Sequence, residues 1–332
     1  MNLPPFNYLE PLTLKEALSM LNKYRSRVKI VAGGTEITNH LKSKNLTPSF
    51  ILTLRKISGL HGIKENKNEV VIGSYTTLKE IHNSSVIRKK FKSIADSANY
   101  VAAPPIQNRA TVGGNILQNT RCMFYNQSEF FLKGLTPCYK RSGKVCHAVK
   151  GSKRCFSVYQ GDMAPILIAL DAKIILEKKG KARKLPLFDL FTGEGTGPFS
   201  IGNNELLTKI IIPIPKGNHS SAYEKMRVRG SLEYPFASVA VSLEMGKNGH
   251  LAKARVVIGA AGSSPKSIEE TALYFTKTWP KESDIEIIGT HALEASEMVN
   301  NLSMPALYRR KMVKVLTKRA VKRALKDLKR GT

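Results

Sequence analysis

The sequence is poor in acidic residues and has no long apolar stretch, and each shortage excludes a class of protein. It contains 25 Asp and Glu residues against 53 Lys and Arg, a formal net charge of +28 over 332 residues. The most apolar helical stretch, residues 163–170, ends at Asp171, far short of the roughly 20 residues that a membrane-spanning helix requires. Residues 1–10 contain two prolines and no apolar core of a secretory signal. We therefore expect a cytoplasmic protein that does not enter the membrane.

Two common binding motifs are also missing. No Gly-x-Gly-x-x-Gly stretch opens a helix after a strand, so a Rossmann fold is not indicated. The glycines at 193, 195 and 197 lie in a predicted connector. No nucleic-acid-binding motif accompanies the positive charge, which is spread over the whole length. A solvated basic surface is the simplest explanation of the charge, and a basic, zinc-stabilised protein that binds nucleic acid is the alternative.

Cysteine is rare, but its four copies lie close together in the sequence. They are Cys122, Cys138, Cys146 and Cys155, and this clustering predicts one local structure that uses all of them. A reducing compartment disfavours disulfides. Zinc sites usually contain short Cys-x-x-Cys pairs, whereas the gaps here are fifteen, seven and eight residues. An iron-sulfur cluster ligated by the four thiolates is the leading hypothesis, with zinc, disulfides and unrelated buried thiols as alternatives.

Basic residues surround these cysteines. A site made of four thiolates is strongly negative, so neighbouring cations favour the thiolate form and offset its charge. Glu129 is the one acid between the first and last cysteine. The basic residues are Arg121, Lys133, Lys140, Arg141, Lys144, Lys150, Lys153 and Arg154.

The hydrophobic pattern predicts an α+β protein. Capping boxes at Thr13 with Glu16 and at Thr77 with Glu80 mark the starts of two helices. We expect helices at 13–24, 77–83, 86–101, 163–170, 267–276, 290–299 and 305–329. We expect strands at 28–31, 50–54, 69–72, 172–177, 206–214, 223–229, 237–245 and 252–259. A polar link at 216–221 is the expected domain boundary.

Two Gly-Gly turns stand out among these elements. Gly33 and Gly34 follow the strand at 28–31, and Gly113 and Gly114 follow a Thr-Val pair. A glycine turn between a strand and a helix lets an anion approach backbone N–H groups. We predict that the two turns together hold the two phosphates of a dinucleotide.

Several motifs resemble the FAD-binding subunit of the molybdenum hydroxylase (xanthine dehydrogenase) family. They are Val-Ala-Gly-Gly-Thr-Glu at 31–36, Ala-Thr-Val-Gly-Gly-Asn at 110–115, Gly-Asp at 161–162, Tyr-Glu-Lys-Met-Arg at 223–227, Ile-Gly-Ala-Ala-Gly-Ser-Ser-Pro at 258–265 and Tyr-Arg-Arg at 308–310. The resemblance implies a two-lobed PCMH-type FAD-binding domain at 1–216, with lobes at about 1–58 and 59–216. A CO dehydrogenase flavoprotein C-terminal-like α+β domain would follow at 217–332.

The cysteine-containing insertion at 120–160 resembles that of the β subunit of 4-hydroxybenzoyl-CoA reductase, which holds a 4Fe-4S cluster. That resemblance implies an (αβγ)2 complex with a molybdopterin-binding large subunit and a small subunit with two 2Fe-2S clusters. A low-potential, acidic ferredoxin would supply electrons, and the large subunit would dehydroxylate the substrate to benzoyl-CoA. The alternative within the family is a flavin subunit of another xanthine, aldehyde or CO dehydrogenase-like complex.

The resemblance also assigns residues to the FAD. The pyrophosphate and ribityl chain would contact the two glycine motifs, Asp162 would accept hydrogen bonds from flavin or ribityl hydroxyls, and Lys225 would lie near the isoalloxazine. The cofactor-binding residues it implies are Lys29, Ile30, Val31, Ala32, Gly33, Gly34, Thr35, Glu36, Val101, Thr111, Val112, Gly113, Gly114, Asn115, Asp162 and Lys225. The chain itself would have no catalytic residue, because the substrate chemistry belongs to the molybdenum subunit. No role is transferred to residues 229–234, where the sequence departs from the family pattern.

Overall fold

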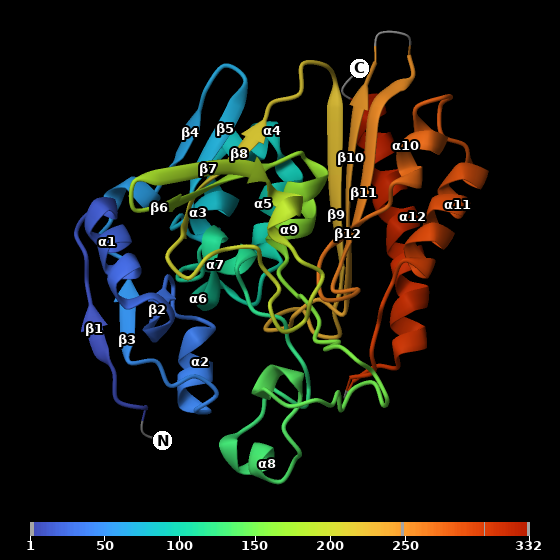
Figure 1. Ribbon diagram of the computed structural model, residues 1–332. Helices are drawn as coiled ribbons and strands as arrows, with labels where there is room; N and C mark the ends of the chain where they lie inside the picture. The colour runs from blue at the N-terminus through green and yellow to red at the C-terminus, as the bar shows by residue number, and fades with distance from the viewer. Residues whose placement is uncertain (1–2, 247–248, 302, 331–332) are drawn as a thin grey trace.

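The computed structural model describes residues 3–246, 249–301 and 303–330, which form three sheets and the helices that cover them (Figure 1). The N-terminal sheet is parallel, in the order β1-β3-β2. Its strands are β1 (Asn7–Leu9), β2 (Val28–Val31) and β3 (Phe50–Thr53). Helix α1 (Leu14–Tyr24) packs its apolar face on this sheet, and α2 (Ile37–Lys42) follows the first Gly-Gly turn.

The second sheet is antiparallel, in the order β4-β5-β8-β6-β7. Its strands are β4 (Ile63–Glu65), β5 (Glu69–Gly73), β6 (Lys173–Lys178), β7 (Lys181–Pro186) and β8 (Leu206–Pro213). The helices around it are α3 (Leu78–Asn83), α4 (Ser85–Lys90), α5 (Lys92–Asn99), α6 (Pro104–Gln107), α7 (Val112–Ile116) and α9 (Met163–Ala169).

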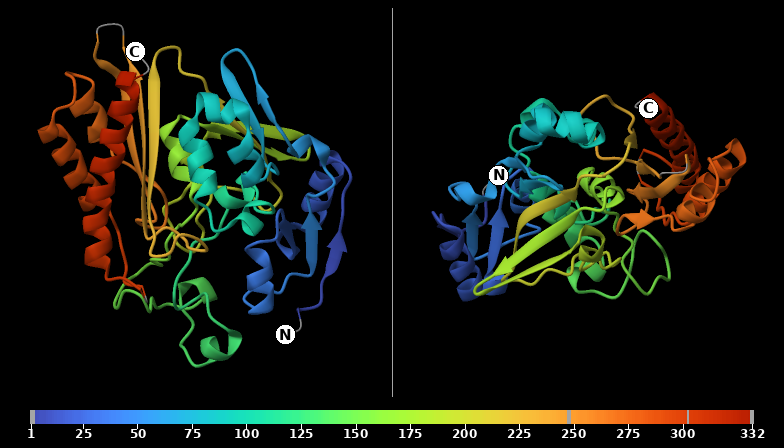
Figure 2. Two further views of the ribbon diagram at one scale, coloured as in Figure 1. Left: turned by 180° about the vertical axis from the view of Figure 1, so that it is seen from behind. Right: turned by 90° about the horizontal axis from the view of Figure 1, so that it is seen from above.

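The third sheet, β12-β11-β10-β9, is antiparallel and carries the C-terminal helices on one face (Figure 2). Its strands are β9 (His219–Met226), β10 (Ala237–Met245), β11 (Leu251–Gly259) and β12 (Lys266–Ser267). The helices are α10 (Glu270–Phe275), α11 (Glu282–Glu294) and α12 (Ala306–Arg330). Within the described residues, none of the helices combines the length and the hydropathy needed to cross a bilayer.

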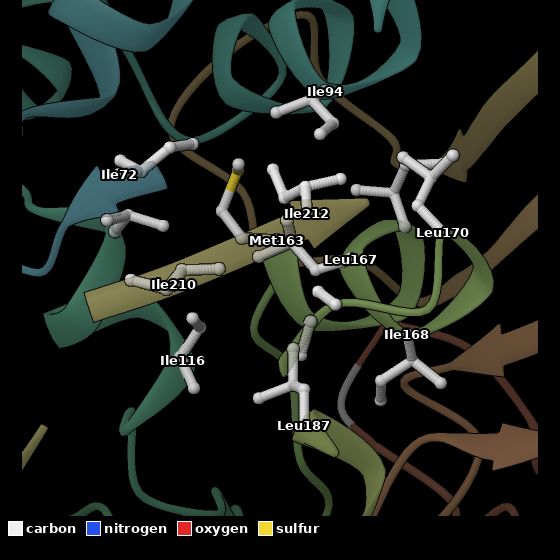
Figure 3. Packing of buried hydrophobic residues seen from close by; sticks show 14 of the residues in the cluster. Ile72, Ile94, Ile116, Met163, Leu167, Ile168, Leu170, Leu187, Ile210 and Ile212 are labelled. Carbon is white, nitrogen blue, oxygen red and sulfur yellow. The ribbon is translucent and has the colours of Figure 1, made fainter. Parts of the chain in front are cut away.

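Helix α9 lies at the centre of the molecule. Every one of its side chains is buried, and it contacts β10 and β11 on one side and α5 and α7 on the other. Figure 3 shows Met163, Leu167 and Ile168 of this helix among isoleucines of β5, α5, α7 and β8. An uninterrupted apolar run is required here because no face of the helix reaches solvent. Truncating Leu167 to Ala would cost about 2–5 kcal/mol of folding free energy.

Residues 120–160, here called the cysteine lobe, project from one end of the body (Figures 1 and 2). The lobe is mostly irregular and contains the short helix α8 (Glu129–Lys133). An isolated antiparallel bridge of Arg121 with Val158 joins the beginning of the lobe to its end. The lobe is therefore an excursion from the path that leads from α7 to α9.

Two predicted helices differ from the structure. The helix expected at 86–101 is divided into α4 and α5 at Phe91, whose φ of −144° is not helical and whose ring is fully buried. The helix expected at 290–299 instead begins at Glu282 and ends at Glu294. The side-chain oxygens of Asn300 and Asn301 accept backbone N–H groups of the following residues, which favours a turn over a helix.

The strands β1, β4, β7 and β12 were not predicted. The strand expected at 223–229 begins earlier, at His219, inside the expected link at 216–221, and ends at Met226.

Candidate FAD cavity and cysteine site

A cavity of about 370 Å³ lies where the three sheets meet. Both Gly-Gly turns line it, although Gly34 and Gly113 are 79 positions apart in the sequence. The lining also includes residues of β8 and of the loop at 232–234, so all three parts of the fold contribute. Its inner wall is largely apolar, from Ile30, Leu54, Val101 and Leu207.

The first Gly-Gly turn lines this cavity and has free backbone donors. In the described part of the chain, no hydrogen bond uses the N–H groups of residues 33–36. Gly34 adopts a φ of +78°, which favours glycine. A Cβ on Gly33 would lie 1.8 Å from the carbonyl oxygen of Arg109, so this glycine also lets the two glycine loops pack together. This turn therefore provides the open set of N–H donors that an anion needs.

The second Gly-Gly turn is different, because its backbone donors are already used. The N–H of Gly113 donates to the carbonyl of Ser74 at 2.8 Å, and that of Gly114 donates to Oγ1 of Thr111, the N-cap of α7, at 3.1 Å. Val112 and Asn115 also donate to carbonyls. The prediction that both turns offer N–H groups to phosphate is thus supported by geometry at the first turn only. The second turn contributes shape, since Gly114 lines the cavity without a side chain.

Three polar side-chain atoms at the cavity are buried without any hydrogen-bond partner. They are Oε1 of Glu36, Oγ of Ser74 and Nε2 of Gln118. The Glu36 oxygen also lies 3.9 Å from Nη1 of Arg121 and 3.8 Å from Nε2 of His40, beyond hydrogen-bonding distance. Buried polar atoms normally have partners, and an orphan calls for an explanation such as a ligand. Ser74 and Gln118 were not predicted from the sequence; Gln118 lies three residues after Asn115, and that closeness was the one available signal. Glycine-lined space, open donors and orphaned polar atoms fit a polar, phosphate-containing cofactor such as FAD.

Asp162 and Lys225 form a buried ion pair at the edge of this cavity. Lys225 Nζ lies 3.0 Å from Asp162 Oδ1, and the Tyr223 hydroxyl donates to the same oxygen at 2.8 Å. Lys225 also donates to the carbonyls of Tyr100 and Glu233. Burial raises the pKa of Asp162, and the Lys225 charge opposes that rise. Lys225 does not line the cavity, so in this structure its ammonium serves Asp162 rather than an open flavin site.

The loop from β9 to β10 closes one side of the cavity through Leu232, Glu233 and Tyr234. Leu232 donates its N–H to the carbonyl of Ala102 and has a left-handed φ of 55°. The guanidinium of Arg121 lies 4.3 Å above the Tyr234 ring. This loop was given no role from the sequence, because its residues depart from the family pattern.

Most residues predicted to bind the cofactor do line the cavity. Those that line it are Ile30, Ala32, Gly33, Gly34, Thr35, Glu36, Val101, Thr111, Gly113, Gly114, Asn115 and Asp162. The others are Lys29, which is exposed, Val31 and Val112, which face elsewhere, and Lys225. Alternation of side chains along β2 explains why Lys29 and Val31 point away while Ile30 points in.

All four cysteines border one small cavity in the cysteine lobe, and none is disulfide-bonded. Burial raises the pKa of the Cys122 thiol, and the nearby Cys155 and Cys146 add to the rise. Cys155 is the most buried of the four, and its sulfur donates to Ser157 Oγ at 3.2 Å. Among the described residues, no three His, Cys, Asp or Glu side chains are grouped closely enough to hold a single metal ion.

Lys140 also borders the cysteine cavity. Its ammonium donates to the carbonyl and hydroxyl of Thr120, both at 2.6 Å, and to Asn119 Oδ1 at 3.1 Å. Burial lowers its pKa to about 8, although the neighbouring thiols and Glu36 act in the opposite direction.

Comparison with known proteins identifies the family. The model of the FAD-binding domain in molybdopterin dehydrogenase matches residues 4–215. The chain belongs to this family. The model of the CO dehydrogenase flavoprotein C-terminal domain matches residues 221–324. Together the two domain matches cover most of the chain. The predicted family and fold class are confirmed.

Relatives match this chain over different lengths, from less than two thirds of the relative to almost all of it. The carbon monoxide dehydrogenase medium chain of Afipia carboxidovorans is 27% identical over 319 residues, which cover 96% of each chain. The nicotinate dehydrogenase FAD-subunit of Eubacterium barkeri is 26% identical over 68% of this chain and 64% of that subunit. A reconstituted CO dehydrogenase from Oligotropha carboxidovorans contains a chain that superposes with a TM-score of 0.81 at 26% identity, over 98% of this chain and 99% of that one. These proteins are oxidoreductase subunits.

Proposed function

We propose that this chain is the FAD- and iron-sulfur-containing electron-transfer subunit of a molybdenum hydroxylase-type complex. The observation that carries the proposal is the cavity between the sheets, with its open N–H donors at residues 33–36 and its three orphaned polar atoms. FAD supplies electron exchange when bound. The chain's own residues bind and orient it, and the loop at 232–234 shields it from water.

In this proposal the N–H groups of residues 33–36 hold the pyrophosphate, where backbone donors and a helix start favour negative charge. Gln118 and Ser74 would be available to donate hydrogen bonds to the cofactor, and Glu36 Oε1 would be available to accept one. Asp162 acts through the buried network with Lys225, which fixes Glu233 and hence the loop that closes the cavity.

The cysteine lobe would hold a 4Fe-4S cluster through Cys122, Cys138, Cys146 and Cys155. Supporting this, all four cysteines line one small cavity, and among the residues that the structure describes no three metal-binding side chains are close enough to hold a single ion. A tetrahedral zinc with Zn–S distances of about 2.3 Å requires sulfurs within about 4 Å of one another. A cluster is larger and suits sulfurs that are spread around a cavity. The absence of a disulfide among the four also leaves them available as thiolate ligands.

The finer assignment is 4-hydroxybenzoyl-CoA reductase, and the resemblance of the insertion supports it. The partners would then be a molybdopterin-binding large subunit, a small subunit with two 2Fe-2S clusters and an acidic ferredoxin, in a cytoplasmic (αβγ)2 assembly. A flavin subunit of a different family member, such as an aldehyde or CO dehydrogenase-like complex, is the second candidate. The relatives are subunits of several different dehydrogenases, which supports the family-level role that both candidates share.

The nucleic-acid alternative is weakened by the C-terminal helix. Much of the basic face of α12 forms ion pairs within the chain, such as Lys322 with Glu282 at 2.7 Å and Arg323 with Asp96 at 3.0 Å. Lys314 and Lys318 both contact Glu286. These charges are therefore already compensated by neighbouring elements, and a phosphate backbone is not needed to offset them.

Purification of the native complex tests the assignment. One large subunit that contains molybdenum and one small subunit that contains iron should co-purify with the tagged chain. Assays of that complex with reduced ferredoxin and 4-hydroxybenzoyl-CoA, against aldehydes and carbon monoxide with an artificial acceptor, would choose between the two candidates. Recovery of the chain alone, bound to nucleic acid, would contradict the proposal.

A further inference from the structure

The Lys140 ammonium occupies a position between the cysteine cavity and the FAD cavity. Lys140 borders the cavity that the four thiols surround, and its Nζ is fixed by Thr120 and Asn119. The backbone N–H of Asn119 donates to Glu36 Oε2 at 3.4 Å, and Glu36 lines the FAD cavity. Lys140 therefore borders the cysteine cavity and is connected through Asn119 to Glu36 at the FAD cavity.

The hydrogen bonds on the cysteine side lead to the most buried thiol. Thr120 Oγ1 accepts from Lys140 at 2.6 Å and from Ser157 Oγ at 2.7 Å. The Cys155 sulfur lies 3.2 Å from the Ser157 hydroxyl oxygen. This network orients the hydroxyl of Ser157 and keeps the ammonium beside the thiols. The ring of Tyr125 lies 4.9 Å from Nζ and covers it on another side.

The other cations of the cysteine lobe are placed differently. Arg141 donates to the carbonyl of Leu132, Arg154 pairs with Glu297, and Lys133 pairs with Glu129. Lys144 and Lys153 are exposed. Among the described residues that line the cysteine cavity, Lys140 is the one with an ammonium or guanidinium group. Its charge therefore acts in a partly desolvated place, where a charge has a larger effect than at the surface.

We propose that Lys140 is a positioning residue that sets the reduction potential of the iron-sulfur site and links it to the FAD cavity. The inference rests on the proposed function of the cysteine lobe. One-electron reduction adds a negative charge to a site that already contains four thiolates, and a fixed cation stabilises that added charge. Replacement of the cation by a neutral group makes reduction less favourable, so the potential falls. No proton or bond changes in this step.

Redox titration of the assembled complex, followed by electron paramagnetic resonance, tests the role. Lys140→Gln should lower the equilibrium constant for reduction of the cluster by at least about tenfold, which is about 59 mV for a one-electron couple. Lys144→Gln is the matched control, because it removes one charge from the exposed part of the same lobe and should leave the potential unchanged. Lys140→Arg, which keeps the charge, should lie closer to the wild type than Lys140→Gln.

The outcomes separate this inference from the proposed function. If wild-type protein contains no iron, the cluster assignment fails, and the inference fails with it. If the cluster is present and Lys140→Gln and Lys144→Gln shift its potential equally, or neither shifts it, the inference alone is wrong. Should Lys140→Gln fail to assemble the cluster, retention of iron by Lys140→Arg would support the need for a cation. Equal loss from both variants would contradict it.

Discussion

Lys225 Nζ lies 3.0 Å from Asp162 Oδ1, and the two side chains are only 2% and 3% exposed. The pair joins β9 of the C-terminal sheet to the start of α9 in the FAD-binding region. The Tyr223 hydroxyl and two carbonyls satisfy the remaining hydrogen-bonding groups. This contact therefore fixes the C-terminal sheet, and the loop that follows β9, against the cofactor cavity.

Breaking that ion pair should destabilise the protein strongly. Lys225→Met leaves the Asp162 carboxylate buried without its partner, and we expect the free energy of unfolding to fall by about 3–5 kcal/mol. The matched control is Lys56→Met, which removes an exposed pair with Glu10 and should cost no more than about 1 kcal/mol. Urea unfolding measures both. Equal stability of the two variants would show that the buried pair has no special role.

The stability of the second sheet should depend on pH through Glu205. The bidentate hydrogen bond from Arg183 lowers the pKa of Glu205, with N–O distances of 2.9 and 2.8 Å. A lowered carboxyl pKa stabilises the folded state above the unfolded-state pKa, and this contribution is lost as pH falls through the folded-state value. Wild-type protein should therefore lose more thermal stability than Glu205→Gln as pH falls from 6 to below 4.5, the ordinary pKa of the group. Parallel melting curves at all pH values would refute this.

Gly114 offers the cleanest test of the FAD cavity. A Cβ there would meet only Thr111 Oγ1 at 3.0 Å and Ala32 Cβ at 3.7 Å, whereas a Cβ on Gly33 would collide with the Arg109 backbone. Gly114→Val should therefore reduce bound FAD several-fold by filling the cavity, with a smaller effect on the fold than a change at Gly33. Gly59→Val is the control, since nothing lies within 4 Å of a Cβ at that position. Flavin fluorescence after denaturation measures occupancy, and full FAD in Gly114→Val would place the cofactor elsewhere.

The local sequence was enough to predict most elements but not how distant segments meet. The capping box at Thr77 and Glu80 is present as expected, because its contacts lie within four residues. At the first helix, Glu16 accepts from the N–H of Leu12 instead of Thr13, so only half of that box forms. The break at Phe91 depends on burial of its ring, which local periodicity does not reveal.

The residues of the FAD cavity were likewise predicted only in part from the sequence. The glycine motifs, on which the family resemblance rests, identified fewer than half of the residues that line the cavity. Ser74 and Gln118 were missed since their importance depends on having no partner in the fold. The sequence also could not show that the backbone N–H groups of residues 112–115 are already hydrogen-bonded. Two of them donate to the carbonyls of Ser74 and Thr76, which are distant in sequence.

The charge of the cysteine lobe should control encounters with an acidic electron carrier. A protein at +28 attracts such carriers and raises the association rate by a factor of about 10 to 1000 at low salt. Screening limits the reach of the field to about 8 Å at physiological ionic strength, so the second-order rate should fall steeply as salt is added. Charge reversal at the exposed Lys144 and Lys153 should lower the rate at low salt.

The control for that experiment must avoid residues with structural ion pairs. Lys314 and Lys322 contact Glu286 and Glu282, so reversing them would also disturb α11 and α12. Lys311 and Lys326 are exposed on α12 and are the better pair. Stopped-flow reduction of the complex should be more sensitive to reversal in the lobe than on the helix. If reversal on α12 lowers the rate as much as reversal in the lobe, or if the rate does not change with salt, the basic charge does not guide the carrier to the cysteine lobe.

The cysteine site decides the central claim. Anaerobically purified chain should contain about one FAD and roughly four iron and four sulfide per molecule. Replacing Cys155 by Ser should remove or degrade the cluster while leaving FAD in place, because the cysteine lobe and the glycine turns border different cavities. The most direct measurement is therefore a joint determination of iron, sulfide, zinc and FAD in wild-type protein and Cys155→Ser. Iron and flavin in the wild type, with iron alone lost from the variant, is the predicted result; stoichiometric zinc without iron, or no flavin, would contradict the account.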